Sequence, residues 1–415
     1  MEFRDLKKQY QILQSEMDQA LLGAVSEGRF IMGPQVRQLE QELAAYVGVK
    51  HCLTCANGTD ALTLALKAWG IGPDDAVFVP DFTFFSSGEV ASLEGATPVF
   101  VDVQEETFNM DTEDLERAIR ETLSAGQLRP RVIVAVDLFG QPAEYPRIRD
   151  IADRYDLLIL EDGAQGFGGS ICQAPCHHAP CHSERSEESR SFGKPQDDTA
   201  IRRACSFGDI STTSFFPAKP LGCYGDGGAV FTDNDEWAAL MASYRIHGKG
   251  EDKYDNVRIG MNSRLDTLQA AILLVKLKAF RDYELDAVNR VAERYTSLLQ
   301  DCVLTPVVRD GFRSSWAQYT IRLKDSAERD ALQATLKEQG IPSMVYYPKP
   351  MHLQSAFACH SERSEESNSS GKPQDDMCPT ATRLCSQVLS LPMHPYMTEA
   401  QIQEVCDAIR ATLNR

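Results

Sequence analysis

The strongest constraint on the fold is a regular alternation of short apolar runs with amphipathic stretches between residues 50 and 160. The apolar runs have the length of buried strands, and the amphipathic stretches have the spacing of helices. The predicted strands are 76–80, 98–103, 131–136 and 157–160, and the predicted helices between them are 60–69, 112–124 and 144–155. This alternation indicates βαβ units and a mostly parallel sheet, in which ligands bind at the carboxyl ends of the strands.

Two further regions flank this alternating segment. The elements predicted there are helices at 10–24 and 34–47, a long helix from about Asn262 past Phe280, a strand at 316–323, a helix at 325–339 and a strand at 343–347. The last three are typical of a smaller α+β unit. We therefore expect a large domain of residues 1–261 and a small C-terminal domain of residues 262–415.

Composition narrows the class of protein. The formal net charge of -18 comes from 42 basic and 60 acidic side chains, which argues against a nucleic-acid partner because such a partner needs a basic face. The first residues are charged rather than apolar, and no run of about 18 apolar residues occurs, so we expect neither secretion nor a membrane span. Cysteines scattered in apolar stretches favour reduced thiols and a cytoplasmic protein.

Two nearly identical segments interrupt the pattern. Residues 181–198 read CHSERSEESRSFGKPQDD, and residues 359–376 read CHSERSEESNSSGKPQDD. Both are almost free of apolar residues, so we interpret them as a duplicated insertion in surface loops at about 171–202 and 358–378. The first loop carries a cluster of possible zinc ligands, Cys172, Cys176, His177, His178, Cys181 and His182, and the second copy keeps Cys359 and His360, with Cys378 beyond it. The spacing fits no structural zinc site that we recognise, and we expect no metal.

Lys219 is the first candidate for chemistry. It lies in SFFPAKPLGCYGDGGAV (214–230), between Ala218 and Pro220 and without charged neighbours. Desolvation lowers the pKa of an amine and makes it nucleophilic toward carbonyl carbons, as Schiff-base catalysis requires. A structural lysine is instead usually found on a solvated helix face among other charges.

Three more features could surround such an amine. The strand at 157–160 ends in an acid, Asp162, which could hold a pyridine nitrogen protonated or could only cap a helix. Gly58 and Thr59 stand directly before a helix, where backbone N–H groups bind phosphate, although an ordinary turn looks the same. Phe84 follows a strand and could stack on a flat cofactor or belong to the core.

Five strings together resemble the DegT/StrS family of sugar aminotransferases: CANGTDAL (55–62), EDGAQGFG (161–168), SFFPAKPLGCYGDGGA (214–229), GMNSRLDTLQAAILL (260–274) and SLPMHPYM (390–397). They span nearly the whole chain outside the two inserts. The resemblance implies an α/β fold of the fold-type-I, aspartate-aminotransferase-like class, with pyridoxal 5′-phosphate (PLP) as cofactor. The last two strings look most like enzymes that aminate a UDP-linked 3-keto-hexuronic acid with L-glutamate, for surface polysaccharide synthesis.

The resemblance also implies roles around the cofactor. Lys219 would be the Schiff-base lysine, and Asp162 would pair with the ring nitrogen. Gln165 would lie near the ring hydroxyl, and Phe84 would stack on the ring. The phosphate would be held by Gly58, Thr59 and Ser214.

Further roles concern the substrate and a second subunit. Asn262 would complete the phosphate site of the neighbouring subunit, which implies a homodimer with shared active sites. Arg264, also from the partner, would bind the substrate carboxylate, since an arginine fork suits a uronic acid; a structural ion pair with Asp266 or another acid is the alternative. Tyr346 and Tyr347 would line the sugar site, where related enzymes have His-Tyr.

Three other functions remain open at this stage. A sugar 3-dehydratase of the same fold would carry histidine at the position of Lys219, so the lysine argues against it. An aminotransferase could act on another nucleotide-linked keto-sugar, such as a 4-keto-6-deoxy hexose. A regulatory relative could keep the fold without turnover.

Overall fold

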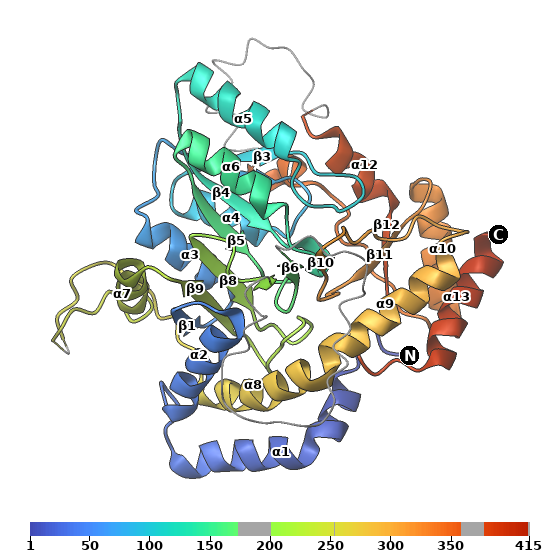
Figure 1. Ribbon diagram of the computed structural model, residues 1–415, viewed down its shortest axis with the longest axis horizontal. Coiled ribbons are helices and arrows are strands. Elements are labelled where there is room, and N and C mark those ends of the chain that lie inside the picture. Colours follow the sequence, from blue (N-terminus) through green and yellow to red (C-terminus); the bar gives the residue numbers. More distant parts are fainter. Residues whose placement is uncertain (173–200, 253, 358–376, 414–415) are drawn as a thin grey trace.

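The computed structural model describes residues 1–172, 201–252, 254–357 and 377–413 (Figure 1). Its centre is a seven-stranded sheet with the order β1-β9-β8-β5-β4-β2-β3. The strands are β1 (His51–Cys55), β2 (Asp75–Pro80), β3 (Thr97–Val101), β4 (Arg129–Val136), β5 (Leu158–Asp162), β8 (Ile210–Ser214) and β9 (Gly228–Thr232). Strands β3, β2, β4, β5 and β8 pair in parallel, and β9 is antiparallel to β8 and β1.

Helices surround this sheet. They are α1 (Leu6–Glu27), α2 (Pro34–Val47), α3 (Gly58–Ala68), α4 (Ser86–Leu93), α5 (Thr112–Ala125), α6 (Tyr145–Tyr155), α7 (Asp235–Tyr244), α8 (Thr267–Ala279), α9 (Leu285–Leu299), α10 (Ser326–Glu338), α12 (Pro379–Gln387) and α13 (Glu399–Leu413). Short helical turns are η1 (Leu138–Gly140), the π-helical η3 (Phe280–Glu284) and η4 (Met351–Leu353).

Local sequence explains where these helices begin and end. Helix α2 starts with Pro34 in its first turn and stops at Gly48, whose φ of 90° is left-handed. Helix α5 begins after Asp111, whose side chain accepts hydrogen bonds from the first backbone N–H groups. These caps supply partners for backbone groups that the helix itself leaves unpaired.

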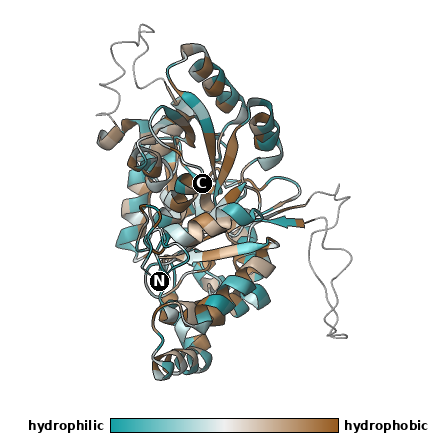
Figure 2. Ribbon diagram, turned by 90° about the vertical axis from the view of Figure 1, so that its left-hand side faces the viewer, coloured by the Kyte–Doolittle hydropathy of each residue, from teal (hydrophilic) through white to brown (hydrophobic). Residues whose placement is uncertain are grey.

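The two faces of the sheet pack against different helices. Successive residues of a strand point to opposite faces, so Val77 and Val79 of β2 pack with α3 and α4, whereas Ala76 and Phe78 pack with α5 and α6. Figure 1 shows α5 and α6 together on one side of the sheet, and Figure 2 shows apolar segments concentrated in the strands. The sheet is therefore buried on both faces, as a parallel sheet requires.

The C-terminal third forms a second cluster. Strand β11 (Tyr319–Arg322) pairs antiparallel with β12 (Val388–Leu391), and α9 and α10 pack against α13. A small sheet joins β10 (Phe312–Arg313), β6 (Ser170–Cys172) and β7 (Ile201–Arg203). The division into domains 1–261 and 262–415 stays a prediction.

Most predicted elements are found, with two corrections. The helix expected from Asn262 begins at Thr267, because Asn262 first forms an isolated bridge with Ile246. Residues 343–347 are not a strand: Met344 alone bridges Ser390, and the chain then turns so that the ring of Tyr347 packs beside Phe84. Alternating hydrophobicity does not reveal such a turn, because aromatic residues at a ligand crevice have the same pattern as a strand.

The first insert lies where the sequence placed it, between the paired strands β6 and β7. The metal candidates of the inserts lie outside the described residues, except Cys172 in β6 and Cys378 before α12. None of the helices in the described ranges combines the length and apolar character needed to cross a bilayer.

Candidate functional site

The acid at the end of β5 is the centre of the site. Asp162 is buried, and β5 is the middle strand of the sheet. Its Oδ2 accepts a 2.7 Å hydrogen bond from the Ser87 hydroxyl, and its Oδ1 accepts one from the Ala164 backbone N–H at 3.2 Å. The Ser87 hydroxyl is also 3.1 Å from that of Thr83. These contacts fix the carboxylate at the carboxyl edge of the sheet, where the sequence predicted the ligand crevice.

The neighbouring acid, Glu161, serves the fold instead. Its carboxylate accepts hydrogen bonds from the backbone N–H of Phe207 at 2.6 Å and of Gly208 at 3.2 Å, and from the Ser211 hydroxyl at 2.7 Å. Because adjacent strand residues point to opposite faces, only one of the two acids can face the crevice. Asp162 is that residue.

The residues predicted to hold a phosphate, here called the cradle, lie at the start of α3 and at the end of β8. Helix α3 begins at Gly58, and the Asn57 side chain caps it by accepting from the Asp60 N–H at 2.8 Å. A Cβ atom built on Gly58 would lie 2.8 Å from the Cβ of Ser214, so the helix start and the end of β8 touch. The Thr59 hydroxyl is 2.8 Å from that of Ser86. Backbone N–H groups and hydroxyls thus converge where the helix dipole favours an anion.

Lys219 lies in the loop that follows β8. Its backbone N–H donates to the Phe216 carbonyl at 2.8 Å, which curls the segment back toward the sheet. Burial lowers the pKa of the Lys219 ammonium; the charge of Asp162 opposes this shift, and the guanidinium of Arg4 adds to it. The amine that the sequence singled out is therefore partly buried, and the charge of the predicted acid acts on its pKa.

Aromatic side chains also line the candidate site. Phe84 is 54% exposed, which leaves its face free for a ligand, and its ring centroid is 6.3 Å from that of Tyr347. The Gln165 side chain donates to the Tyr347 hydroxyl at 3.1 Å and accepts from the Phe139 N–H at 2.9 Å. Burial raises the pKa of Tyr347, and the charge of Asp162 raises it further, so the phenol stays protonated. Tyr346 packs 5.7 Å from Tyr347, ring to ring.

Asn262 and Arg264 lie beside the start of the cradle. The Ala56 N–H donates to the hydroxyl of Ser263, which stands between them, at 3.1 Å. The Arg264 guanidinium donates to the Asn262 side chain, and no ion pair with Asp266 is found in the described part of the chain. The role of Arg264 in substrate binding stays a prediction.

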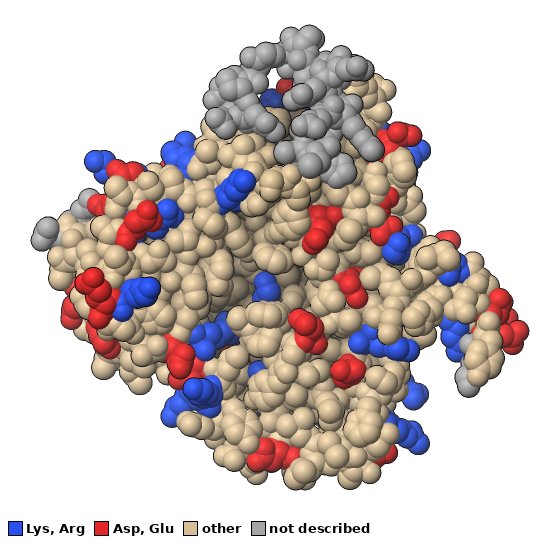
Figure 3. All heavy atoms as spheres, turned by 180° about the vertical axis from the view of Figure 1, so that it is seen from behind, with Lys and Arg blue, Asp and Glu red and all other residues tan. Residues whose placement is uncertain are grey.

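Sequence reasoning missed two neighbours of the predicted residues. Ser87 stands in the string DFTFFSS, from which only Phe84 was chosen, and a hydroxyl in the turn after a strand was the available signal. Arg4 comes from the N-terminal segment and donates to the Pro220 carbonyl at 3.2 Å, beside a small cavity that Lys219, Lys276 and His394 also line. No local pattern relates residue 4 to residue 219. Figure 3 shows basic and acidic side chains interspersed over the face seen from behind.

Comparisons with known proteins agree with this geometry. A family model described as the DegT/DnrJ/EryC1/StrS aminotransferase family matches residues 11–410. The UDP-2-acetamido-2-deoxy-3-oxo-D-glucuronate aminotransferase of Pseudomonas aeruginosa is 39% identical, covering 99% of each chain. The pleiotropic regulatory protein of Geobacillus stearothermophilus is also 39% identical, covering 98% of this chain and 96% of its own.

A solved structure of the same family has a similar fold. The DegT DnrJ EryC1 StrS aminotransferase from Brucella abortus superimposes with a TM-score of 0.86 at 45% identity, covering 100% of both chains. The predicted α/β fold, that of fold-type-I PLP-dependent transferases, is confirmed.

Proposed function

The chain belongs to the DegT/DnrJ/EryC1/StrS aminotransferase family, and we propose that it transfers an amino group from L-glutamate to a UDP-linked 3-keto-hexuronic acid. The observation that carries this proposal is the buried Asp162 carboxylate, which Ser87 holds at the carboxyl edge of the sheet, together with Lys219 in the loop after β8, where the charge of Asp162 acts on its pKa. The similarity to the Pseudomonas enzyme supports the choice of sugar. We propose that the product enters surface polysaccharide.

The residues present fit the family's cofactor, PLP. When bound, PLP supplies an aldehyde carbon that amines attack and a ring that accepts electrons. The contact between Gly58 and Ser214 brings backbone N–H groups and hydroxyls together for the phosphate. The half-exposed face of Phe84 suits the flat ring, and Asp162 offers a carboxylate for the ring nitrogen.

Lys219 has two tasks in this proposal. Its Nζ must be neutral to attack a carbonyl carbon, and burial together with Arg4 favours that form by lowering its pKa. The same Nζ would then carry the proton from the α-carbon of glutamate to the aldehyde carbon that PLP supplies, and would run this transfer in reverse with the keto-sugar. Because the keto acid formed from glutamate leaves before the sugar binds, the overall reaction would be ping-pong. Ser87 keeps the Asp162 carboxylate oriented throughout.

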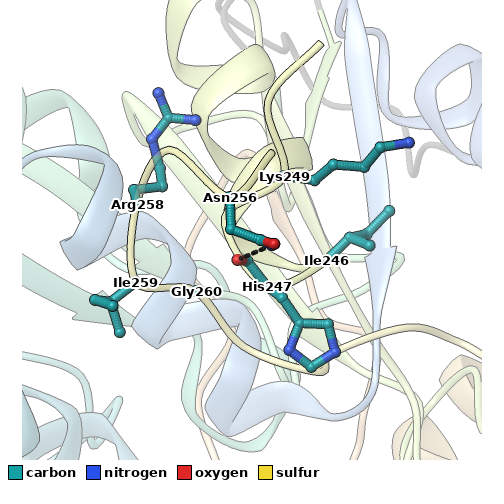
Figure 4. A pocket seen from close by; sticks show the side chains of 7 residues that line it. All are labelled: Ile246, His247, Lys249, Asn256, Arg258, Ile259 and Gly260. Carbon is teal, nitrogen blue, oxygen red and sulfur yellow. Dashed lines mark hydrogen bonds between the residues drawn. The ribbon is translucent and has the colours of Figure 1, made fainter. Parts of the chain in front are cut away.

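We propose that a homodimer completes the site. The loop of residues 246–260 extends from the body beside α7 (Figure 1) and exposes apolar side chains: Tyr254 is 85%, Val257 54% and Ile259 90% exposed. With Ile246, His247, Lys249, Asn256, Arg258 and Gly260, Ile259 lines an open hollow of about 580 Å³ (Figure 4). Asn262 and Arg264 follow this loop directly. In this proposal the loop packs on a second copy and brings Asn262 and Arg264 to its site.

The test is direct conversion. Protein supplied with PLP and L-glutamate is incubated with the UDP-linked 3-keto-uronate, and mass spectrometry detects the amino sugar. Lys219→Ala should reduce turnover by about 10³-fold or more, because both nucleophile and proton carrier are lost. Lys278→Ala is the matched control, since Lys278 is 73% exposed and pairs with Asp282. Full activity of Lys219→Ala would overturn the proposal.

Two competing functions have their own outcomes. Amination of a nucleotide-linked 4-keto-6-deoxy hexose, with no product from the uronate, would favour a different sugar substrate. The second is a regulatory role, and the observation behind it is the similarity to a pleiotropic regulatory protein. A protein that develops no visible absorption with PLP and converts neither sugar would support that reading.

A further inference from the structure

A second group of reactive side chains lies apart from Lys219. Asp81, directly after β2, His352 of η4 and Cys378, directly before α12, place ligand atoms within 4.8 Å of one another. Asp81 and Cys378 are 0% exposed and His352 is 3% exposed. Carboxylate, imidazole and thiol are the donor set that zinc accepts.

Within the described ranges, the contacts in this triad leave one ring nitrogen of His352 without a hydrogen-bond partner. The Asp81 carboxylate accepts from the His352 backbone N–H at 2.7 Å and lies 2.6 Å from its ring Nδ1. The other ring nitrogen, Nε2, is buried and has no hydrogen-bond partner within the described ranges. An unpaired buried ring nitrogen costs about 1–3 kcal/mol, so it calls for an unseen partner.

We propose that Asp81, His352 and Cys378 bind one zinc ion. Ligand atoms of a tetrahedral zinc site stand about 3.5 Å apart. The three ligand atoms lie within 4.8 Å of one another, and the 2.6 Å contact between Asp81 and Nδ1 of His352 would have to open by about 1 Å for both groups to bind the ion. Binding breaks the S–H bond of Cys378 and forms a bond from sulfur to zinc, and the proton passes to solvent. The fourth position is left to water or another ligand.

The ion would have a structural purpose. His352 and Cys378 lie on either side of the second insert, residues 359–376, and Asp81 precedes the loop that carries Phe84. Holding the two ends of an inserted segment together offsets the entropy of closing a long loop. The bond between zinc and Cys378 would also hold the start of α12 beside the end of β2, which leads into the loop that carries Phe84.

The experiment measures zinc in the full-length holoprotein after equilibration with zinc and exhaustive dialysis. We expect wild type to retain one more zinc per chain than Cys378→Ser, and zinc to raise the Tm of wild type by about 2–5 °C but not that of the variant. Cys385→Ser is the matched control, because Cys385 is also buried, lies on the helix that Cys378 precedes, and is outside the triad. It should bind zinc as wild type does.

X-ray absorption of the zinc-loaded wild type gives a readout that depends on no variant. One sulfur with nitrogen and oxygen neighbours supports the triad. Several sulfur neighbours would instead assign the ion to the cysteines of the first insert and overturn the proposal, as would equal zinc content in wild type and Cys378→Ser. Retention of no zinc by wild type would overturn it too.

Discussion

Polar side chains at the carboxyl edge of the central sheet are buried and hydrogen-bonded, whereas apolar side chains of the loop of residues 246–260 are exposed to solvent. At the sheet edge, Asp162 is buried and hydrogen-bonded to Ser87. In the loop, Ile259 is 90% exposed and the Asn256 side chain donates to the backbone carbonyl of His247. One chain is sufficient to orient the acid, whereas the apolar surface of the loop remains in water unless another molecule covers it.

This difference separates two parts of the proposed activity. Orientation of the reacting groups depends on contacts within the chain, so its loss should appear in turnover and leave assembly intact. Completion of the phosphate and carboxylate sites depends on the loop, so its loss should change assembly and substrate affinity together. Each prediction below tests one side of this separation.

The largest effect is expected at the acid itself. Asp162→Asn removes the charge that would keep the ring nitrogen protonated and should reduce turnover by about 10²–10⁴-fold without changing the oligomeric state. Asp153→Asn, at a 67% exposed carboxylate, is the control. Steady-state kinetics and light scattering give both readouts, and dissociation of Asp162→Asn would show that the sheet edge and the assembly are not separate.

The loop should respond to a charge placed on its exposed apolar surface. Ile259→Asp should raise the dimer dissociation constant at least about tenfold, because it buries an unpaired carboxylate in the proposed interface. Leu123→Asp, at a 51% exposed position on α5, should have no such effect. Sedimentation of both variants makes the comparison. An unchanged dimer dissociation constant for Ile259→Asp would show that the loop is not part of the interface.

A smaller effect is expected one contact away from the acid. Ser87→Ala deletes the 2.7 Å hydrogen bond to Asp162, which as a bond to a charged group is worth about 1.5–3 kcal/mol, and should slow turnover about tenfold. Ser92→Ala is the control, since Ser92 is on the same helix and its hydroxyl has no partner in the described structure. Equal kinetics of the two variants would mean that the orientation of Asp162 does not depend on Ser87.

The smallest effect concerns stability beneath the site. Burial raises the pKa of the Asp137 carboxyl well above its usual range, and the charge of Glu161 raises it further, although the Tyr145 hydroxyl donates to it at 2.7 Å. Protonated Asp137 therefore stabilises the fold, and this contribution is lost as pH rises through the raised pKa. From about pH 5 to about pH 9, the free energy of unfolding should fall more for wild type than for Asp137→Asn in urea titrations. If the free energies of unfolding of the two proteins fell equally with pH, Asp137 would not be the group that holds the proton.

Much of the fold could be predicted because its signals are local. The strand that ends at Asp162 and the helix that begins at Gly58 follow from apolar runs and capping residues within a few positions. The segment 343–347 failed this approach, since its rings face the crevice rather than a neighbouring strand. The alternation of apolar and polar residues is the same for a strand paired in a sheet and for a turn whose rings face a crevice, so it cannot tell them apart.

The sequence by itself determined the order of the elements, the desolvated setting of Lys219 and the acid at the end of the central strand. Tertiary structure alone decided that Glu161 binds the Ser211 hydroxyl, that Ser87 holds Asp162, and that Arg4 lies beside Lys219. It also brought Asp81, His352 and Cys378 together. The physical reason is that periodicity and capping act over a few residues, whereas these contacts join positions separated by tens to hundreds of residues and form only when the sheet is assembled.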